Sequence, residues 1–183
     1  HVLHVHVHCR LDGSPSWWLS VIYGPFSNDT RLLSFEELRA FHAAHVGPWA
    51  LTGDFNLIYQ AADKNNSNLD RRWMGRFRRF LDDLELAKLN LHGRRYTWSN
   101  ERRQPTLVRL DRWFYSMDWE LFPNCLLRVG SSLSSDHCPI VLHSNLLAPK
   151  CYRFKFEAIW TKFDGFILVV ANAWASPCPT HLD

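Results

Sequence analysis

The sequence predicts one α/β or α+β sandwich in which short strands outnumber helices. Strand-like runs of alternating or continuous apolar residues recur along residues 1–145, and two stretches between them have apolar side chains at helical spacing. The chain has 183 residues, 46% of them hydrophobic and 14% aromatic, which is enough to bury a sizeable core. Strands mixed with helices around one core favour a layered sandwich.

The first elements expected are two strands, residues 1–9 and 16–24, that pair as a hairpin. The first of them, HVLHVHVHC, alternates in the way of a half-buried strand. The connecting segment, RLDGSPS, carries Asp-Gly and Ser-Pro pairs, which are turn signals. Because the chain opens without methionine and inside such a strand, we expect it to be a piece of a longer domain with one sheet incomplete.

Residues 31–45 predict the first helix. Its apolar face is defined by side chains at three-residue steps, namely Leu32, Phe35, Leu38 and Phe41. Asn, Asp and Thr at residues 28–30 are suitable N-terminal caps, and Gly47 with Pro48 ends the pattern. The spacing is that of an amphipathic helix lying on a sheet.

Residues 73–91 predict the second helix, and the remaining segments predict strands and a tail. Phe77, Phe80, Leu81 and Leu84 lie at helical spacing, with arginines on the opposite side. The strand-like segments are residues 49–58, 96–100, 106–116 and 134–143. An aromatic-rich helical pattern at residues 151–174 follows a change in texture near residue 146. We therefore expect a domain at residues 1–145 and a helical tail at residues 146–183 that leads out of it.

Composition restricts the class of protein. A net charge of +3 permits a nucleic-acid partner without requiring one. The five cysteines are scattered and never spaced as CxxC, which argues against a zinc knuckle or a disulfide framework and favours a reducing, nuclear or cytoplasmic location. The longest apolar run, residues 166–171, is far shorter than a membrane span. We expect no membrane association, and no obligate protein partner is evident.

Three short polar motifs interrupt or end apolar strands and carry the candidate chemistry. They are GDFN with Asp54 and Asn56, RLDR with Asp111, and SDHCP with Asp136 and His137. Residues two apart on a strand share a face, so Asp54 and Asn56 can project together, whereas Asp136 and His137 do so only where the backbone turns. Phosphoester hydrolysis by water uses these types: carboxylates for a hard cation, a group that orients water, and an imidazole held by a carboxylate.

Each feature also has a structural interpretation. A lone GDFN is more often a turn than a catalytic loop, RLDR alone is an ordinary surface charge pair, and an Asp-His pair is as often structural as functional. The alternating His4, His6 and His8 allow a zinc site, but an exposed strand face explains them better. The arginines of residues 71–79 allow contact with a phosphate backbone, but a solvated helix face explains them better. The functional prediction rests on all three polar motifs together.

Five segments together resemble the endonuclease/exonuclease/phosphatase superfamily, whose fold is DNase I-like. They are VIYGP (residues 21–25), LTGDFN (51–56), YTWSN (96–100), RLDRWFYS (109–116) and SDHCPIVL (135–142). The chain looks most like the endonuclease domain of plant LINE-type non-LTR retrotransposons. The resemblance implies a four-layer α/β sandwich, two mostly antiparallel sheets flanked by helices, with residues 1–145 as the C-terminal two thirds of the family domain.

The resemblance also implies a role for each motif residue. Asp54 would polarise the attacking water while Asn56 orients it and the phosphate. Asp136 would be a ligand of a catalytic Mg²⁺ or Mn²⁺ ion. His137 would contact the phosphate or act as a base, held by a hydrogen bond with Asp111.

Two aromatic residues complete the implied site. Tyr23 would reach a phosphate oxygen. Trp98 matches an aromatic residue near the family's nucleotide pocket, although core packing explains an indole at this position equally well. Phe26 stands where the family's apurinic members have an asparagine after the Tyr-x-Pro motif, which weakens one expected phosphate contact.

The function implied is Mg-dependent phosphodiester hydrolysis on DNA by a retroelement-type endonuclease domain. The family's metal-binding glutamate precedes VIYGP, but residues 1–22 contain no glutamate and no asparagine. Whether this chain is an active enzyme is therefore open. One alternative is a catalytically inactive retroelement remnant or nucleic-acid-binding fragment, and another is a phosphomonoesterase of the same superfamily.

Overall fold

A computed structural model describes residues 1–8, 16–116, 125–132, 134–143 and 165–175. The chain divides into two compact units, His1–Leu147 and Ala148–Asp183, which are treated separately below. The boundary expected at residue 145 lies outside the described residues and stays a prediction. The candidate site belongs to the first unit.

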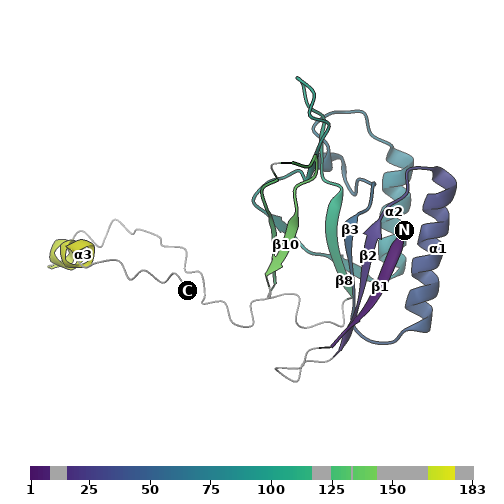
Figure 1. Cartoon of the computed structure of the whole chain (residues 1–183), viewed down its shortest axis with the longest axis horizontal. Helices are drawn as coiled ribbons and strands as arrows, with labels where there is room; N and C mark the ends of the chain where they lie inside the picture. Colours follow the sequence, from purple (N-terminus) through teal and green to yellow (C-terminus); the bar gives the residue numbers. More distant parts are fainter. Residues whose placement is uncertain (9–15, 117–124, 133, 144–164, 176–183) are drawn as a thin grey trace. The chain divides into compact units, whose positions relative to one another are not determined.

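The first unit is organised around a five-stranded sheet (Figure 1). Its strands, in spatial order, are β1 (Val2–Val7), β2 (Trp17–Tyr23), β3 (Trp49–Asp54), β8 (Asp111–Ser116) and β4 (Leu86–Lys88). The predicted pairing of β1 with β2 is confirmed, in a register that sets Val2 opposite Ile22; the connecting residues 9–15 are not among those described. Only β2 and β3 run parallel, because a helix connects them, and the other neighbours are antiparallel.

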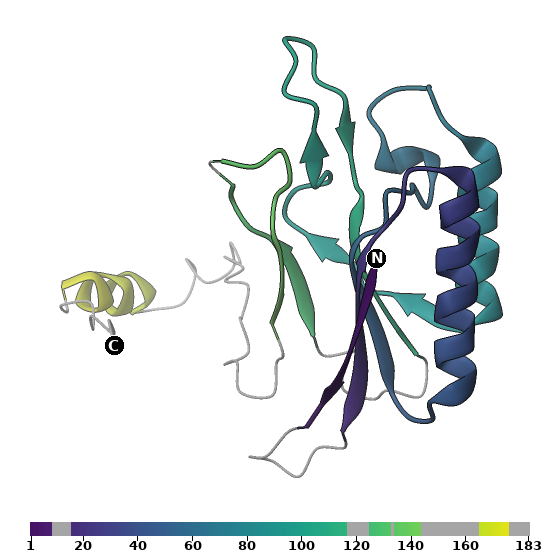
Figure 2. The same ribbon diagram turned by 45° about the vertical axis from the view of Figure 1, so that its right-hand side comes forward.

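A smaller sheet covers the opposite face of the large one from the helices (Figures 1 and 2). It consists of β10 (Ile140–His143), β9 (Leu126–Val129) and β5 (Leu91–His92), while β6 (Trp98–Ser99) and β7 (Leu107–Val108) form a separate two-stranded ribbon. The prediction of an α/β sandwich with two mostly antiparallel sheets is confirmed. Helical layers were expected on both outer faces of the sandwich. In the described part of this unit, two helices form one such layer beside β1, β2 and β3.

The first of these helices, α1, spans Asn28–Ala44. The N-cap was expected among residues 28–30, which is wrong by one residue. The N-cap is Ser27, whose Oγ accepts the backbone N–H of Thr30 at 3.3 Å. Phe35 and Leu38 are buried as expected, whereas Leu32 is 44% exposed. The apolar face therefore centres on the middle of the helix.

The second helix, α2, spans Arg71–Asp83 and begins at Asp70, whose carboxylate accepts the backbone N–H of Trp73 at 3.0 Å. It ends earlier than the apolar spacing of residues 73–91 indicated, because Glu85 has a left-handed backbone with φ 51°. After that turn, Leu86 begins β4 and Leu91 begins β5. A short 3-10 helix, η1 (Ala61–Asp63), precedes α2 within the polar loop.

Two hydrophobic clusters fill the layers of this unit. Between the helices and the large sheet, the rings of Phe35 and Phe80 stack with centroids 4.2 Å apart, and Phe77 meets Phe114 of β8 edge to face. Between the two sheets, Trp113 packs with Ala50 and Leu127. Burial of each large side chain stabilises the fold by about 1.5–3 kcal/mol. These contacts hold β3 and β8 firmly from both faces.

In the second unit the structure describes one helix, α3 (Phe166–Ala175), within the segment predicted to be helical. Several of its apolar side chains are exposed, including Ile167 at 77% and Trp174 at 86%. Among the described residues, no helix combines the length and the apolarity needed to cross a membrane.

Candidate active site

The sheet brings three of the expected residues into one row. In the parallel pairing of β2 with β3, Tyr23 lies opposite Asp54. In the antiparallel pairing of β3 with β8, Asp54 lies opposite Asp111. Residues from motifs far apart in sequence therefore lie side by side at one end of three adjacent strands.

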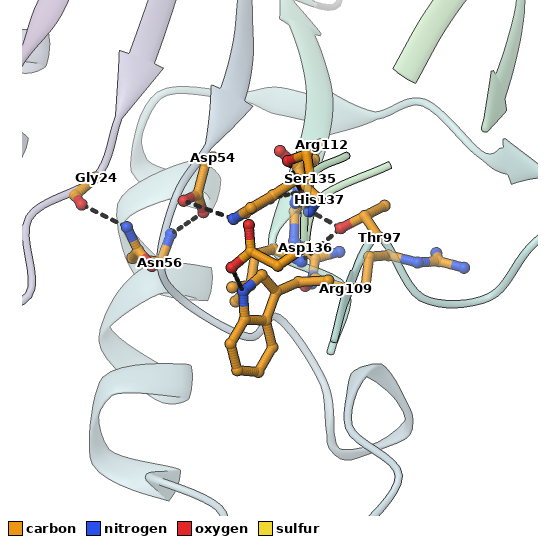
Figure 3. Close-up of polar contacts among 12 residues, drawn as sticks. Gly24, Asp54, Asn56, Thr97, Arg109, Arg112, Ser135, Asp136 and His137 are labelled. Carbon is orange, nitrogen blue, oxygen red and sulfur yellow. Dashed lines mark hydrogen bonds and ion pairs between the residues drawn. The ribbon is translucent and has the colours of Figure 1, made fainter. Parts of the chain in front are cut away.

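The GDFN turn is attached to the loop that follows β2. Asn56 donates its side-chain amide to the carbonyl of Gly24 at 2.7 Å, and its backbone N–H to Asp54 Oδ1 at 2.9 Å (Figure 3). Its backbone is left-handed, with φ 49°, a conformation that asparagine tolerates better than most residues. The backbone of Phe55 contacts Gly24 so closely that any Cβ at residue 24 would clash with it. Asn56 thus holds the loop in place while its amide oxygen remains available to a ligand.

His137 lies between the carboxylates of Asp111 and Asp54. Its Nδ1 is 2.9 Å from Asp111 Oδ2, and its Nε2 is 3.8 Å from Asp54 Oδ2. Because a carboxylate only accepts, the hydrogen bond with Asp111 places a proton on Nδ1. Nε2 is then the nitrogen that faces Asp54.

Burial alters the acidity of Asp54, which is 9% exposed. Loss of solvation is the main cause that raises the pKa of Asp54 above its ordinary value, and the nearby Asp111 adds to it; the N–H of Asn56 and the charge of His137 oppose the shift. A carboxylate with a raised pKa is a better proton acceptor near neutral pH.

Thr97, which the sequence did not single out, supports both Asp111 and His137. Its side chain is fully buried, and its hydroxyl accepts the backbone N–H groups of Leu110 and Asp111, each at 3.1 Å. Its carbonyl accepts the N–H of Cys138 at 2.7 Å. One residue therefore fixes the backbone beside each partner of the Asp111–His137 hydrogen bond.

Asp136 and Trp98 form a second polar pair beside His137. The indole Nε1 of Trp98 donates to Asp136 Oδ2 at 2.8 Å, and the backbone of Trp98 forms an isolated β-bridge with His137. Both Asp136 and His137 face one pocket because they precede β10, so strand alternation does not separate them. Trp98 lines this pocket and is half-buried.

The site opens into a pocket of about 580 Å³. Six of the expected residues line it, namely Tyr23, Asp54, Asn56, Trp98, Asp136 and His137. Phe26, Arg31, Lys64 and Trp73 also contribute to the wall and were not predicted as part of a site. Asp111 is not in the lining, so it acts on the pocket through His137.

A buried ion pair braces the loop behind the site. Arg112 Nη2 lies 2.8 Å from Asp63 Oδ2, and both side chains are almost completely buried. The same carboxylate oxygen accepts the backbone N–H groups of Tyr59 and Gln60. Burial lowers the pKa of Arg112, and the charge of Asp63 opposes that shift. The pair joins η1 to β8 directly after Asp111.

The two alternative clusters have local structural partners. The ring of His4 stacks on Phe41 with centroids 3.7 Å apart, and His6 stacks on Trp18 at 4.1 Å. Within the part of the chain that the structure describes, no three His, Cys, Asp or Glu side chains are grouped to hold a metal. The ring contacts of His4 and His6 give the histidine row a structural explanation. On α2, Arg71, Arg72, Arg78 and Arg79 are exposed, and Arg76 lies over the ring of Trp73 at 5.1 Å.

No family model matches the chain. A search of the curated proteins also found no match. Solved structures do match. The endonuclease domain of TRAS1, a telomere-specific non-LTR retrotransposon, aligns with a TM-score of 0.58 and 20% identity, over 80% of this chain and 64% of that one.

Two further solved structures are similar. The 3'-5' exonuclease NExo of Neisseria meningitidis has a TM-score of 0.57 and 21% identity, over 69% of this chain and 60% of that one. An AP endonuclease of Archaeoglobus fulgidus has a TM-score of 0.55 and 16% identity, over 71% and 62%. This chain thus spans less than two thirds of each neighbour. The neighbours are DNase I-like enzymes, and at these identities the likeness shows that the fold of this chain is DNase I-like.

Proposed function

We propose that this chain is the core of a divalent-metal-dependent phosphodiesterase domain that hydrolyses DNA, of the kind found in plant LINE-type retroelements. The observation that carries the proposal is the placement of His137 between Asp111 and Asp54 at the wall of an open pocket. The fold agrees with it, since TRAS1 is described as a retrotransposon endonuclease and NExo as an exonuclease.

In the proposed reaction, Asp54 accepts the proton of the attacking water. Its raised pKa suits that role, and the oxygen of the Asn56 amide orients the same water. Protonated His137 presents Nε2–H to a phosphate oxygen, while Asp111 stabilises the imidazolium through Nδ1. The Tyr23 hydroxyl donates to a second phosphate oxygen. The phosphate is thus held by groups from β2 and from the segment before β10.

The donor set suits a hard cation that keeps most of its water. Asp136 Oδ2 accepts the Trp98 indole N–H, and its other carboxylate oxygen, Oδ1, is offered to a cation. Mg²⁺ is commonly held by one or two carboxylates, waters and substrate phosphate. When bound there, the cation supplies positive charge that offsets the charge developing on the phosphate and leaving oxygen. The proposed metal ligand from this part of the chain is Asp136.

Nicking of supercoiled plasmid in Mg²⁺, with EDTA as a blank, tests the proposal. The wild-type chain is expected to nick, and His137→Ala or Asp54→Asn to slow nicking at least about 10²-fold. Val46→Ala, at a 97% exposed position after α1, is the control and is expected to behave as wild type. Absence of metal-dependent nicking by the wild-type chain would overturn the proposal.

Hydrolysis of a 3'-phosphate is a second candidate, because a neighbouring structure is described as the 3' phosphatase NExo bound to product DNA hairpin. The same pocket would then release inorganic phosphate from a 3'-phosphorylated oligonucleotide faster than it nicks plasmid. A chain that binds DNA but hydrolyses neither substrate would instead be an inactive remnant.

A further inference from the structure

Phe26 is an exposed aromatic side chain on the rim of the candidate pocket. It is 69% exposed, and Tyr23 beside it is 55% exposed. Both residues line the pocket that contains Asp54 and His137. A single exposed apolar side chain is ordinary. Two adjacent aromatic rings at the rim of a site for phosphate chemistry are a feature that a ligand can use.

The two rings support each other. Their centroids are 6.4 Å apart with planes at 78°, which is an edge-to-face contact. Such contacts stabilise an aromatic pair by about 0.5–1.5 kcal/mol. The edge of one ring thus fixes the orientation of the other, and a broad apolar surface stays open to solvent.

The backbone on either side of Phe26 is anchored to the site. Before it, the carbonyl of Pro25 accepts Arg31 Nε at 3.1 Å, and the N–H of Gly24 bonds to the carbonyl of Asp54. After it, Ser27 caps α1. Arg31 also donates from Nη2 to the carbonyl of Asn56 at 3.2 Å. The position of Phe26 relative to Asp54 is therefore set by hydrogen bonds on both sides.

We propose that Phe26, braced by Tyr23, is a stacking site for an unpaired nucleobase next to the scissile phosphate. This inference rests on the proposed function, because it takes the phosphate to lie against Asp54 and His137. Tyr23 is the register partner of Asp54, so the aromatic pair stands beside that phosphate. The substrate class is a strand whose bases at the cleavage step are unpaired or unstacked.

The chemistry favours a base over other groups. Stacking of a base on an aromatic side chain contributes about 1–3 kcal/mol per base by alanine substitution and tolerates any base. A base inside a duplex is already stacked on both sides and gains little from another ring. Phe26 would therefore favour single-stranded, bulged or frayed sites over regular duplex.

The test compares strand affinity with and without bases. Fluorescence anisotropy in EDTA measures binding of a short labelled oligodeoxyadenylate and of an abasic strand of equal length. Phe26→Ala is expected to weaken binding of the oligodeoxyadenylate about tenfold and to leave the abasic strand unaffected. Phe26→Trp is expected to bind at least as tightly as wild type, because the indole offers more stacking surface. Val46→Ala is the control for loss of an exposed apolar side chain.

Three results would overturn the inference: unchanged affinity in Phe26→Ala, equal losses for both strands, or a wild-type chain that prefers neither strand. Plasmid nicking by the same variants separates this result from the proposed function. Nicking without a Phe26 effect on strand affinity refutes the stacking site alone. A base-dependent Phe26 effect without nicking supports the stacking site and refutes the hydrolysis.

Discussion

Loss of the charge on Asp63 is expected to destabilise the fold strongly, because its partner Arg112 would remain buried. Among the residues that the structure describes, Arg112 Nη2 has one other acceptor, the carbonyl of Arg109 at 2.7 Å, while Nε and Nη1 have no hydrogen-bond partner. Removing one partner of a buried ion pair typically costs about 3–5 kcal/mol. Asp63→Asn keeps the shape and an acceptor for the N–H groups of Tyr59 and Gln60, so the change isolates the charge.

Removing both charges should recover much of that loss. In Asp63→Asn with Arg112→Met, no buried cation is left without a counter-ion, and replacement of a whole buried pair is often close to neutral. The double variant is therefore expected to be more stable than Asp63→Asn alone. Arg112→Met alone should be milder than Asp63→Asn, since Asp63 would keep its two N–H donors.

Urea unfolding followed by tryptophan fluorescence measures these differences. Glu36→Gln is a matched control, because Glu36 pairs with Arg39 at 3.0 Å but both side chains are exposed, and surface pairs contribute about 0–1 kcal/mol. Additive losses in the double variant would refute the reasoning. So would a cost for Asp63→Asn no larger than that of Glu36→Gln.

Three further changes test the site itself. Burial raises the pKa of Asp54 in the folded chain above its value in the unfolded chain. The free energy of unfolding therefore falls as pH rises through the ordinary carboxyl range, because the unfolded chain loses this proton first. Asp54→Asn should therefore be more stable than wild type at neutral pH, and this difference should vanish in acid. Unfolding measured at several pH values checks this, and a difference that does not change with pH would contradict it. Asp111→Asn should lower the nicking rate about 10²-fold or more, because the carboxylate that holds His137 Nδ1 in the proposed mechanism is lost; an unchanged nicking rate would count against that role of Asp111. Thr97→Val should cost about 1 kcal/mol by removing the acceptor of two partly buried N–H groups, whereas Thr97→Ser should restore stability in the same urea experiment. Equal losses in the two variants would show that the methyl group matters and the hydroxyl does not.

The polar motifs contain residues that the structure brings together at one pocket, and their residue types and order are what singled them out in the sequence. Asp54 and Asp111 were expected near each other, and the pairing of β3 with β8 places them opposite. The motifs could not predict the residues that support the site from behind, such as Thr97 and the buried pair of Asp63 with Arg112. Thr97 bonds to backbone groups of segments that meet only in the folded chain, and the partner of Arg112 lies 49 residues away along the chain.

Secondary structure was predicted best where apolar periodicity was long. Strands of six or seven residues, such as β2 and β8, were expected, while the four-residue β9 was not. The helical spacing of residues 73–91 continued past the real end of α2, because leucines at 81 and 84 fit a helix and leucines at 84 and 86 also fit a strand. The left-handed Glu85 decides between them, and a glutamate in a polar stretch carries no signal for that conformation.

The hydrogen bonds that shape this pocket join segments remote in sequence. Asp111 and His137 are 26 residues apart, and Gly24 and Asn56 are 32 apart. Closing such long loops is entropically costly and becomes favourable only together with the surrounding sheet. A partly unfolded chain therefore cannot retain a working pocket as a local unit. Loss of the pocket and loss of the main sheet should coincide, so that any measurement of ligand binding in this pocket also reports whether the first unit is folded.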